Sequence, residues 1–252
     1  MSHARDEFYI GYLPQAPPAL AAWVRRRVLL VLGLALAAGA ALTLGQTDPG
    51  SAVYEFGIVR SFEGDLLLEP APHLVVARPG ETEAMPADSR YLLSVFGKTG
   101  AGPRLADLGG RRVRLRGSLA HRNGGTMIEL ADEPVEDLGP AAPSLAEEDL
   151  GRVTLRGEIV DSKCHWGVMK PGQGKVHRGC AVRCLSGGVP PLLLIRGADS
   201  PLEQVLLAAE DGSSINEALL EWVAEPVEVS GRLARIGDLH VLRTDPATIQ
   251  SR

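Results

Sequence analysis

Cysteine and aromatic residues are both scarce in this chain of 252 residues. Three cysteines are too few for the disulfide-dense scaffold of a small secreted domain, and their odd number leaves one outside any intramolecular disulfide. Aromatic residues make up 4% of the chain, too few for the stacking surfaces of single-strand nucleic-acid binders. The formal net charge of −5 gives no general attraction to phosphate backbones. We therefore expect no nucleic-acid partner.

Several catalytic signatures are also missing. The sequence has no Cys-x-x-Cys, which argues against a thioredoxin-type dithiol, and no Cys-x-x-Cys-His, which argues against covalently attached haem. It contains no phosphate-cradling glycine loop, no serine-hydrolase pattern and no His-Glu-x-x-His helix. The absence of these motifs favours a role other than catalysis, although the cysteines could still carry out a reaction.

The longest apolar run lies near the N-terminus. Val28 to Leu44 carries no charge, and as a helix it would extend about 26 Å, close to the thickness of a bilayer's hydrocarbon core. Arg25, Arg26 and Arg27 precede the run, and no basic residue follows it before Arg60, which orients the N-terminus towards the cytoplasm. We predict a cytoplasmic tail over 1–27 and a single transmembrane helix over 28–45 in the inner (cytoplasmic) membrane.

The alternative for this run is a cleaved signal peptide, for which Ala38-Gly39-Ala40 offers a small-residue processing site. The preceding region over 1–27 contains acidic and aromatic side chains and is long for such a peptide, so an uncleaved anchor is preferred. Both interpretations export the rest of the chain. In a Gram-negative cell that part would lie in the periplasm, where disulfides form.

The exported part contains an internal repeat. Val113–Ala120 matches Val227–Ala234, and each stretch is followed by a glycine-containing turn and an alternating strand. Upstream, we match Gly57-Ile-Val with Gly157-Glu-Ile-Val and Tyr91-Leu-Leu with Leu192-Leu-Leu. This alignment places an insertion in the second copy, around residues 198–225.

Each copy has the pattern of three strands, a short helix and a hairpin, the element order of the OB fold. We therefore predict a mainly β chain, in which the N-terminal transmembrane helix is followed by two OB-like five-stranded small barrels in tandem. The first barrel covers residues 52–130 and the second 151–250. Residues 131–150, rich in proline, alanine and acidic side chains, form the predicted linker.

All three cysteines lie in one segment of the second copy. Cys164 follows the predicted strand Val153–Val160, from whose end a barrel loop can present functional groups. His177, Cys180 and Cys184 are spaced so that they share one face of a helix over 179–185. Cys164 and His165 would close over that face.

Three interpretations of this segment stay open. A disulfide from Cys164 to Cys180 or Cys184 would clip the loop to the barrel. A site made of the three cysteines with His177 or His165 would suit zinc or another transition metal. A redox-active thiol is the third, since basic residues nearby lower a thiol pKa: Arg178, Arg183, Lys170 and Lys175.

The segment also carries a resemblance. Gly157-x-h-x-Asp161-x-x-Cys164 (h, hydrophobic), followed by Cys180-x-x-x-Cys184, resembles small exported bacterial domains of unassigned function, over residues 152–245. The N-terminal Glu7-Phe-Tyr-Ile-Gly11, with the anchor after it, is similar to leaders of membrane-bound subunits of bacterial molybdenum or cytochrome-type redox complexes. The resemblance implies an accessory or electron-transfer-associated membrane protein and transfers no catalytic residues.

From these observations we expect a single-pass, membrane-anchored periplasmic accessory subunit, with other subunits of a membrane redox complex as partners. The alternative is a thiol oxidoreductase or metal-dependent enzyme that uses the same cysteine segment. A third possibility, an OB-type ligand-binding module, would need aromatic side chains on the barrel face, and few are available.

Overall fold

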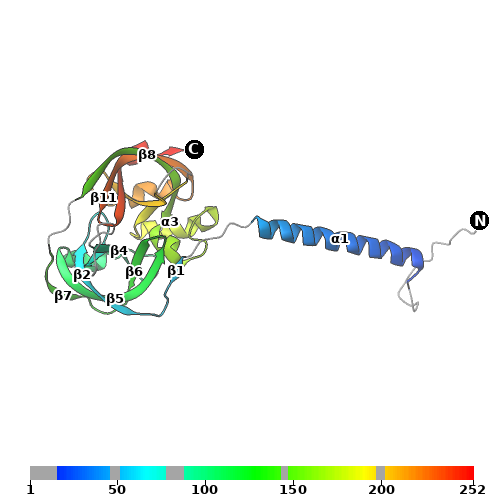
Figure 1. The fold of residues 1–252 in the computed structure, drawn as a ribbon, viewed down its shortest axis with the longest axis horizontal. Coiled ribbons are helices and arrows are strands. Elements are labelled where there is room, and N and C mark those ends of the chain that lie inside the picture. Colours follow the sequence, from blue (N-terminus) through cyan, green and yellow to red (C-terminus); the bar gives the residue numbers. More distant parts are fainter. Residues whose placement is uncertain (1–15, 46–51, 78–87, 143–146, 197–201) are drawn as a thin grey trace, which may run out of the picture. The chain divides into compact units, whose positions relative to one another are not determined.

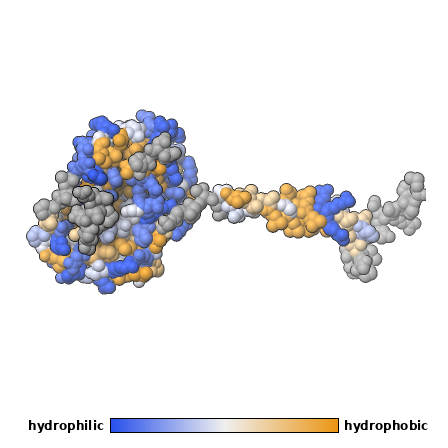
Figure 2. Space-filling model, in the orientation of Figure 1, coloured by the Kyte–Doolittle hydropathy of each residue, from blue (hydrophilic) through white to orange (hydrophobic). Residues whose placement is uncertain are grey.

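A computed structural model describes residues 16–45, 52–77, 88–142, 147–196 and 202–252, and the chain divides into two units, Met1–Asp48 and Pro49–Arg252. The first unit contains α1 (Pro18–Leu44), a single long helix with a mostly hydrophobic surface and no buried residue (Figures 1 and 2). Among the described residues, α1 is the one helix long and apolar enough to cross a membrane.

The apolar N-terminal helix is confirmed, but it starts before the predicted residue 28. Proline is favoured in the first helical turn because its missing N–H would have no partner there, and Pro18 fills this position. The alanine-rich stretch after it continues the helix into Arg25–Arg27. The guanidinium carbon of Arg27 lies 5.3 Å from the ring centroid of Trp23, within the range of a cation–π interaction.

The second unit begins with the first barrel. Its strands are β2 (Arg60–Leu67), β3 (His73–Ala77), β4 (Asp88–Val95), β5 (Arg111–Arg122) and β6 (Gly125–Leu130). Neighbouring strands pair antiparallel, except that β4 pairs parallel with β6, and β2 closes the barrel against β5. The short helices α2 (Gly102–Leu105) and η1 (Ala106–Leu108) lie between β4 and β5 in the chain. Two further strands, β1 (Val53–Tyr54) and β7 (Glu136–Pro140), pair antiparallel with β5.

The second barrel repeats this pairing. Its strands are β8 (Glu148–Asp161), β9 (Pro191–Ile195), β10 (Gln204–Ala209), β11 (Pro226–Ile236) and β12 (Leu239–Thr244), and β10 pairs parallel with β12. The 3-10 helix η4 (Asn216–Trp222) lies between β10 and β11, and η5 (Pro246–Thr248) and β13 (Gln250–Ser251) end the chain. The prediction of two five-stranded, OB-like barrels in tandem is confirmed.

Strand register identifies corresponding positions in the two copies. Val113 of β5 pairs with Gly64 of β2, and Val227 of β11 pairs with Gly157 of β8. The match between Val113–Ala120 and Val227–Ala234 therefore holds in three dimensions. The predicted match of Gly157 with Gly57 is wrong, since Gly64 occupies the equivalent position.

The insertion in the second copy also lies elsewhere than predicted. The counterpart of β4 is β10, because each pairs parallel with the last strand of its barrel, so Tyr91-Leu-Leu does not match Leu192-Leu-Leu of β9. Only Leu68–Pro72 separate β2 from β3, whereas Ser162–Pro190 separate β8 from β9. The insertion is thus the cysteine segment itself, not residues 198–225. Apolar triplets occur in every buried strand and do not identify which strand they form.

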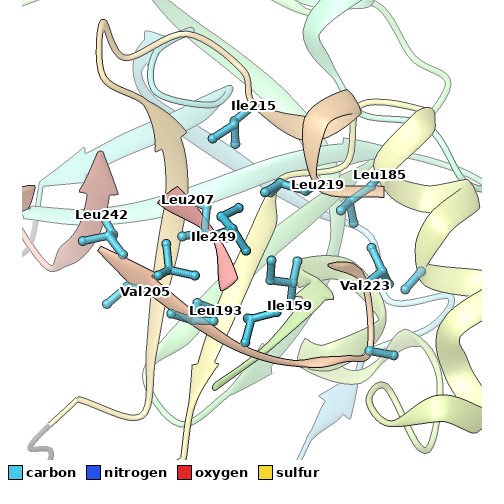
Figure 3. Close-up of a cluster of buried hydrophobic side chains, with 14 of the residues drawn as sticks. Ile159, Leu185, Leu193, Val205, Leu207, Ile215, Leu219, Val223, Leu242 and Ile249 are labelled. Carbon is cyan, nitrogen blue, oxygen red and sulfur yellow. The ribbon is translucent and has the colours of Figure 1, made fainter. Parts of the chain in front are cut away.

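Three apolar clusters hold the second unit together. One fills the second barrel, where Ile159, Leu193 and Leu207 cluster with Leu185 and Leu219 (Figure 3). A second fills the first barrel. The third joins the barrels, because it combines Leu92 and Met127 of the first with buried residues of the second: Val160, Cys164, Trp166, Cys184, Val189, Leu192, Leu194, Leu206, Ala208, Ile236 and Val241.

Candidate metal centre

The inserted segment has three short elements that position its ligands. These are η2 (Cys164–Val168), η3 (Lys175–His177) and α3 (Arg178–Ser186). The predicted helix over 179–185 is confirmed and extends by one residue at each end. It stops at Gly187 and Gly188, and Gly188 has the positive φ of 88° that favours glycine after a helix end.

The three cysteine sulfurs meet in one place. Those of Cys164, Cys180 and Cys184 all lie within 4.8 Å of one another, and the Cys164 and Cys180 Sγ atoms are 3.8 Å apart. Two thiolates bound to one tetrahedral zinc ion, at about 2.3 Å each, are about 3.8 Å apart as well. The distance between Cys164 and Cys180 therefore matches that of two thiolates on one zinc ion, and Cys184 lies close enough to be a third ligand.

The cysteines are free thiols in this structure. A disulfide bond is about 2.0 Å long, so the 3.8 Å separation of Cys164 and Cys180 is that of unbonded sulfurs. Pairing of Cys164 with Cys180 or Cys184 stays a prediction for the oxidised chain.

A second group overlaps the first at Cys164. Asp161, Cys164 and His177 are all buried, and one ligand atom from each lies within 4.8 Å of the others. The Asp161 carboxylate is 3.1 Å from Nε2 of His177, and its other oxygen accepts the backbone N–H of Cys164 at 2.8 Å. A carboxylate that holds one imidazole nitrogen orients the other for a metal, as in many metal centres.

The same three residue types also make up the nucleophile, base and orienting group of thiol hydrolases. Cys164 does not suit that role, because it is only 3% exposed. Its hydrogen bond with Cys184, its burial and the charge of Asp161 all raise its thiol pKa, whereas a nucleophilic cysteine needs a lowered one.

Charge at the cluster favours a thiolate at Cys184. Its pKa is lowered, chiefly by the hydrogen bond with Cys164 and further by the ammonium group of Lys98. Lys98 belongs to the turn after β4, in the first barrel, and its Nζ donates to Cys180 Sγ at 2.6 Å. This contact raises the pKa of Lys98 and keeps it protonated beside the sulfurs.

His165, the other predicted histidine ligand, does not join the cysteines in the part of the chain that the structure describes. Its Nδ1 lies 3.5 Å from a guanidinium nitrogen of Arg122. Burial, and then the charge of Arg122, lower its pKa to about 4. Within η2 the neighbouring Cys164 contributes to the cluster and His165 does not, a distinction that spacing alone did not reveal.

Sequence reasoning missed two residues of the site. Asp161 appears in the Gly-x-h-x-Asp-x-x-Cys pattern, so its position three residues before Cys164 was the available signal. Lys98 had none, because it lies 82 residues from Cys180 in the sequence and reaches it only through the contact between the barrels.

The segment is fixed against the first barrel by buried polar groups. Lys163 is 1% exposed; its Nζ donates to the carbonyl oxygens of Val95 and Gly97 at 2.6 and 2.8 Å and forms an ion pair with Glu129. Trp166 donates to Gln204 at 2.8 Å and lies so close to Gly125 that a Cβ there would approach its ring to 2.3 Å. The ligands are thus mounted at the junction of the barrels.

Comparisons of the chain with protein-family models, with curated proteins and with solved structures give no match in any of the three.

Proposed function

We propose that this protein is a membrane-anchored metal-binding protein whose inserted segment holds one thiolate-preferring ion, such as zinc. The observation that carries this proposal is the convergence of Cys164, Cys180 and Cys184 beside the Asp161–His177 pair. Three cysteines and one histidine are a common zinc ligand set. Thiolates also favour other soft transition-metal ions.

The wider role follows from the anchor and from the resemblance of the leader. We propose a single-pass accessory subunit of a membrane redox complex, with both barrels on the outer face of the inner membrane. The arginines before the apolar stretch of α1 support that orientation. The burial of Cys164 and Cys184 supports a held ion rather than a substrate pocket, since both side chains are at most 3% exposed.

Metal analysis of the purified full chain tests the site. The chain, loaded with zinc and dialysed, should keep one ion, and its thiols should resist alkylation until a chelator is added. His177→Ala should weaken zinc binding by at least about tenfold, and Asp161→Asn by roughly 10–100-fold through loss of its support. Lowering the pH should release the ion as thiolates and imidazole take up protons.

His165→Ala is the matched control, because this buried histidine lies in the same segment but outside the cluster. It should leave zinc affinity unchanged. Three readily alkylated thiols after zinc loading would refute the metal site. Equal affinity in His177→Ala and the wild type would refute His177 as its fourth ligand.

A thiol oxidoreductase is the second candidate, favoured by the lowered pKa of Cys184 and the nearby ammonium group of Lys98. In that case a disulfide substrate would take up two electrons and two protons and leave as two thiols, while Cys164 and Cys180, now 3.8 Å apart, form the bridge. Non-reducing mass spectrometry of the metal-free chain would detect this bridge. Turnover of a small disulfide substrate that disappears in Cys184→Ser would establish this candidate over the accessory role.

A further inference from the structure

An apolar strip lies just after the connection to α1. Val53, Phe56, Ile58 and Val59 are 43%, 74%, 51% and 40% exposed. Single exposed apolar residues are ordinary on protein surfaces, but four within seven successive positions form a local patch that calls for an explanation.

The strip is presented on a fixed turn. The N–H of Ile58 donates to the carbonyl oxygen of Glu55 at 3.0 Å, and Gly57 has a φ of 78°. This is the arrangement of a type II turn, which places Phe56 at its tip. Glu55 N–H donates to the carbonyl oxygen of Leu119 in β5 at 2.8 Å, so the turn is attached to the barrel.

Polar groups within the strip are already paired. The Tyr54 hydroxyl donates to Glu129. Glu55, the single acid between residues 53 and 59, forms an ion pair with Arg60 and lies 3.9 Å from His121. An apolar environment around Phe56 would therefore not have to desolvate an unpaired carboxylate.

The sequence also limits how far the strip can lie from the membrane. Gly45–Ala52 is all that connects the end of α1 to Val53. These residues, fully extended, span roughly 26–29 Å. So short a connection gives the strip a high effective concentration at the bilayer, so that a weak contact is enough to keep it there.

We propose that Val53–Val59 docks on the surface of the lipid bilayer that α1 spans, with Phe56 as the leading side chain. The inference rests on the membrane anchoring proposed above and is independent of the metal. Apolar side chains of interfacial segments insert about 5–10 Å into the boundary between head groups and acyl chains. Docking of this turn would fix one face of the barrel pair towards the membrane.

Phe56→Trp tests this in the full chain, reconstituted into phosphatidylcholine vesicles with either ordinary or brominated acyl chains. The wild type corrects for Trp23, Trp166 and Trp222. Emission from position 56 should shift to the blue in vesicles and be lost in brominated lipid. Phe96→Trp is the matched control, because Phe96 is 73% exposed in a different turn and should keep its emission.

Position 56 emission that resists bromine as fully as position 96 would refute docking on lipid. Blue-shifted emission that appears only when other proteins of the native membrane are added would refute it in favour of a protein partner. Release of the wild-type chain from membranes by alkaline carbonate would refute the anchor, and the docking with it. Retention in carbonate with unquenched position 56 would refute the docking alone.

Discussion

At the scale of single residues, one glycine in each barrel allows the first strand to lie close to the second, and the two glycines occupy equivalent positions. A Cβ on Gly64 would lie 2.3 Å from the carbonyl oxygen of Val75, and one on Gly157 would lie 2.0 Å from that of Leu194. Both distances are far below van der Waals contact, so each copy needs glycine for its strands to pair.

Gly157→Ala should therefore lower the free energy of unfolding by about 1–3 kcal/mol, the usual cost of overpacking a core. Urea unfolding of the detergent-solubilised chain, followed by Trp166 fluorescence, measures this. Gly179→Ala is the control: it lies in α3 with nothing within 4 Å of the added Cβ, and alanine should stabilise the helix by about 0.5–1 kcal/mol. Equal effects of the two changes would contradict the packing argument.

His73 gives a residue-scale dependence on pH. It is fully buried, its Nδ1 lies 2.8 Å from the carbonyl oxygen of Ala71, and burial lowers its pKa to about 4. Its unfolded pKa is about 6.5, so between these values the unfolded chain binds a proton and the folded chain does not. The contribution of His73 to the free energy of unfolding is thus fully present above pH 6.5 and declines as the pH falls towards 4.

The contribution of His73 to this decline is up to about 3 kcal/mol at pH 4. His73→Gln keeps a donor for Ala71 but does not titrate, so the difference between wild-type and variant stability should change across this window. The pKa of His165 is also lowered to about 4. Its effect on the pH dependence of stability is therefore the same in both proteins and cancels in the difference. A difference independent of pH would show that His73 is not the titrating group.

At the scale of elements, Lys163, the residue just before η2, joins the barrels through a buried ion pair with Glu129 of β6. Lys163 and Glu129 have side chains 1% and 9% exposed. Lys163→Met should cost about 3–5 kcal/mol in urea unfolding, because it leaves Glu129 charged and buried without its partner. Adding Glu129→Gln should recover part of that loss.

Lys175→Met is the matched control for Lys163→Met. Lys175 is also paired with a glutamate, Glu225, at 2.7 Å, but its side chain is 71% exposed. Exposed pairs contribute about 0–1 kcal/mol, so this change should be nearly neutral. If Lys163→Met and Lys175→Met lowered the free energy of unfolding by the same amount, burial of the ion pair would not explain the loss.

Elements of local origin were the ones that the sequence could predict. The helical spacing of residues 179–185 predicted α3 and placed Cys180 and Cys184 on the same face of it. The alternation of polar and apolar residues predicted the strands of the barrels. The contact between Lys98 and Cys180 could not be predicted from the sequence, because it depends on how the two barrels pack. His177 and His165 were equally good candidates until the backbone of η2 determined the positions of its side chains.

At the scale of the whole molecule, α1 should determine topology. A periplasm-dependent reporter fused after Arg252 should be active, because basic residues such as Arg25–Arg27 before a span favour a cytoplasmic location for that side of it. An active cytoplasmic reporter at the same position would contradict the orientation. Moving the three arginines to positions 46–48 should reverse the outcome, which controls for reporter folding. A mass spectrum starting at residue 41 would show that the segment is removed.

The segment that carries the cysteines has a second consequence for the molecule as a whole. Its residues complete an apolar cluster that draws on both barrels, and Lys98 of the first barrel touches Cys180 of the second. Each barrel has a core of its own, but the two therefore also share a third apolar cluster. The two copies should melt together in a single cooperative transition, and removal of an ion bound at the proposed site should speed the exchange of amide protons in the first barrel, which contributes no cysteine to that site.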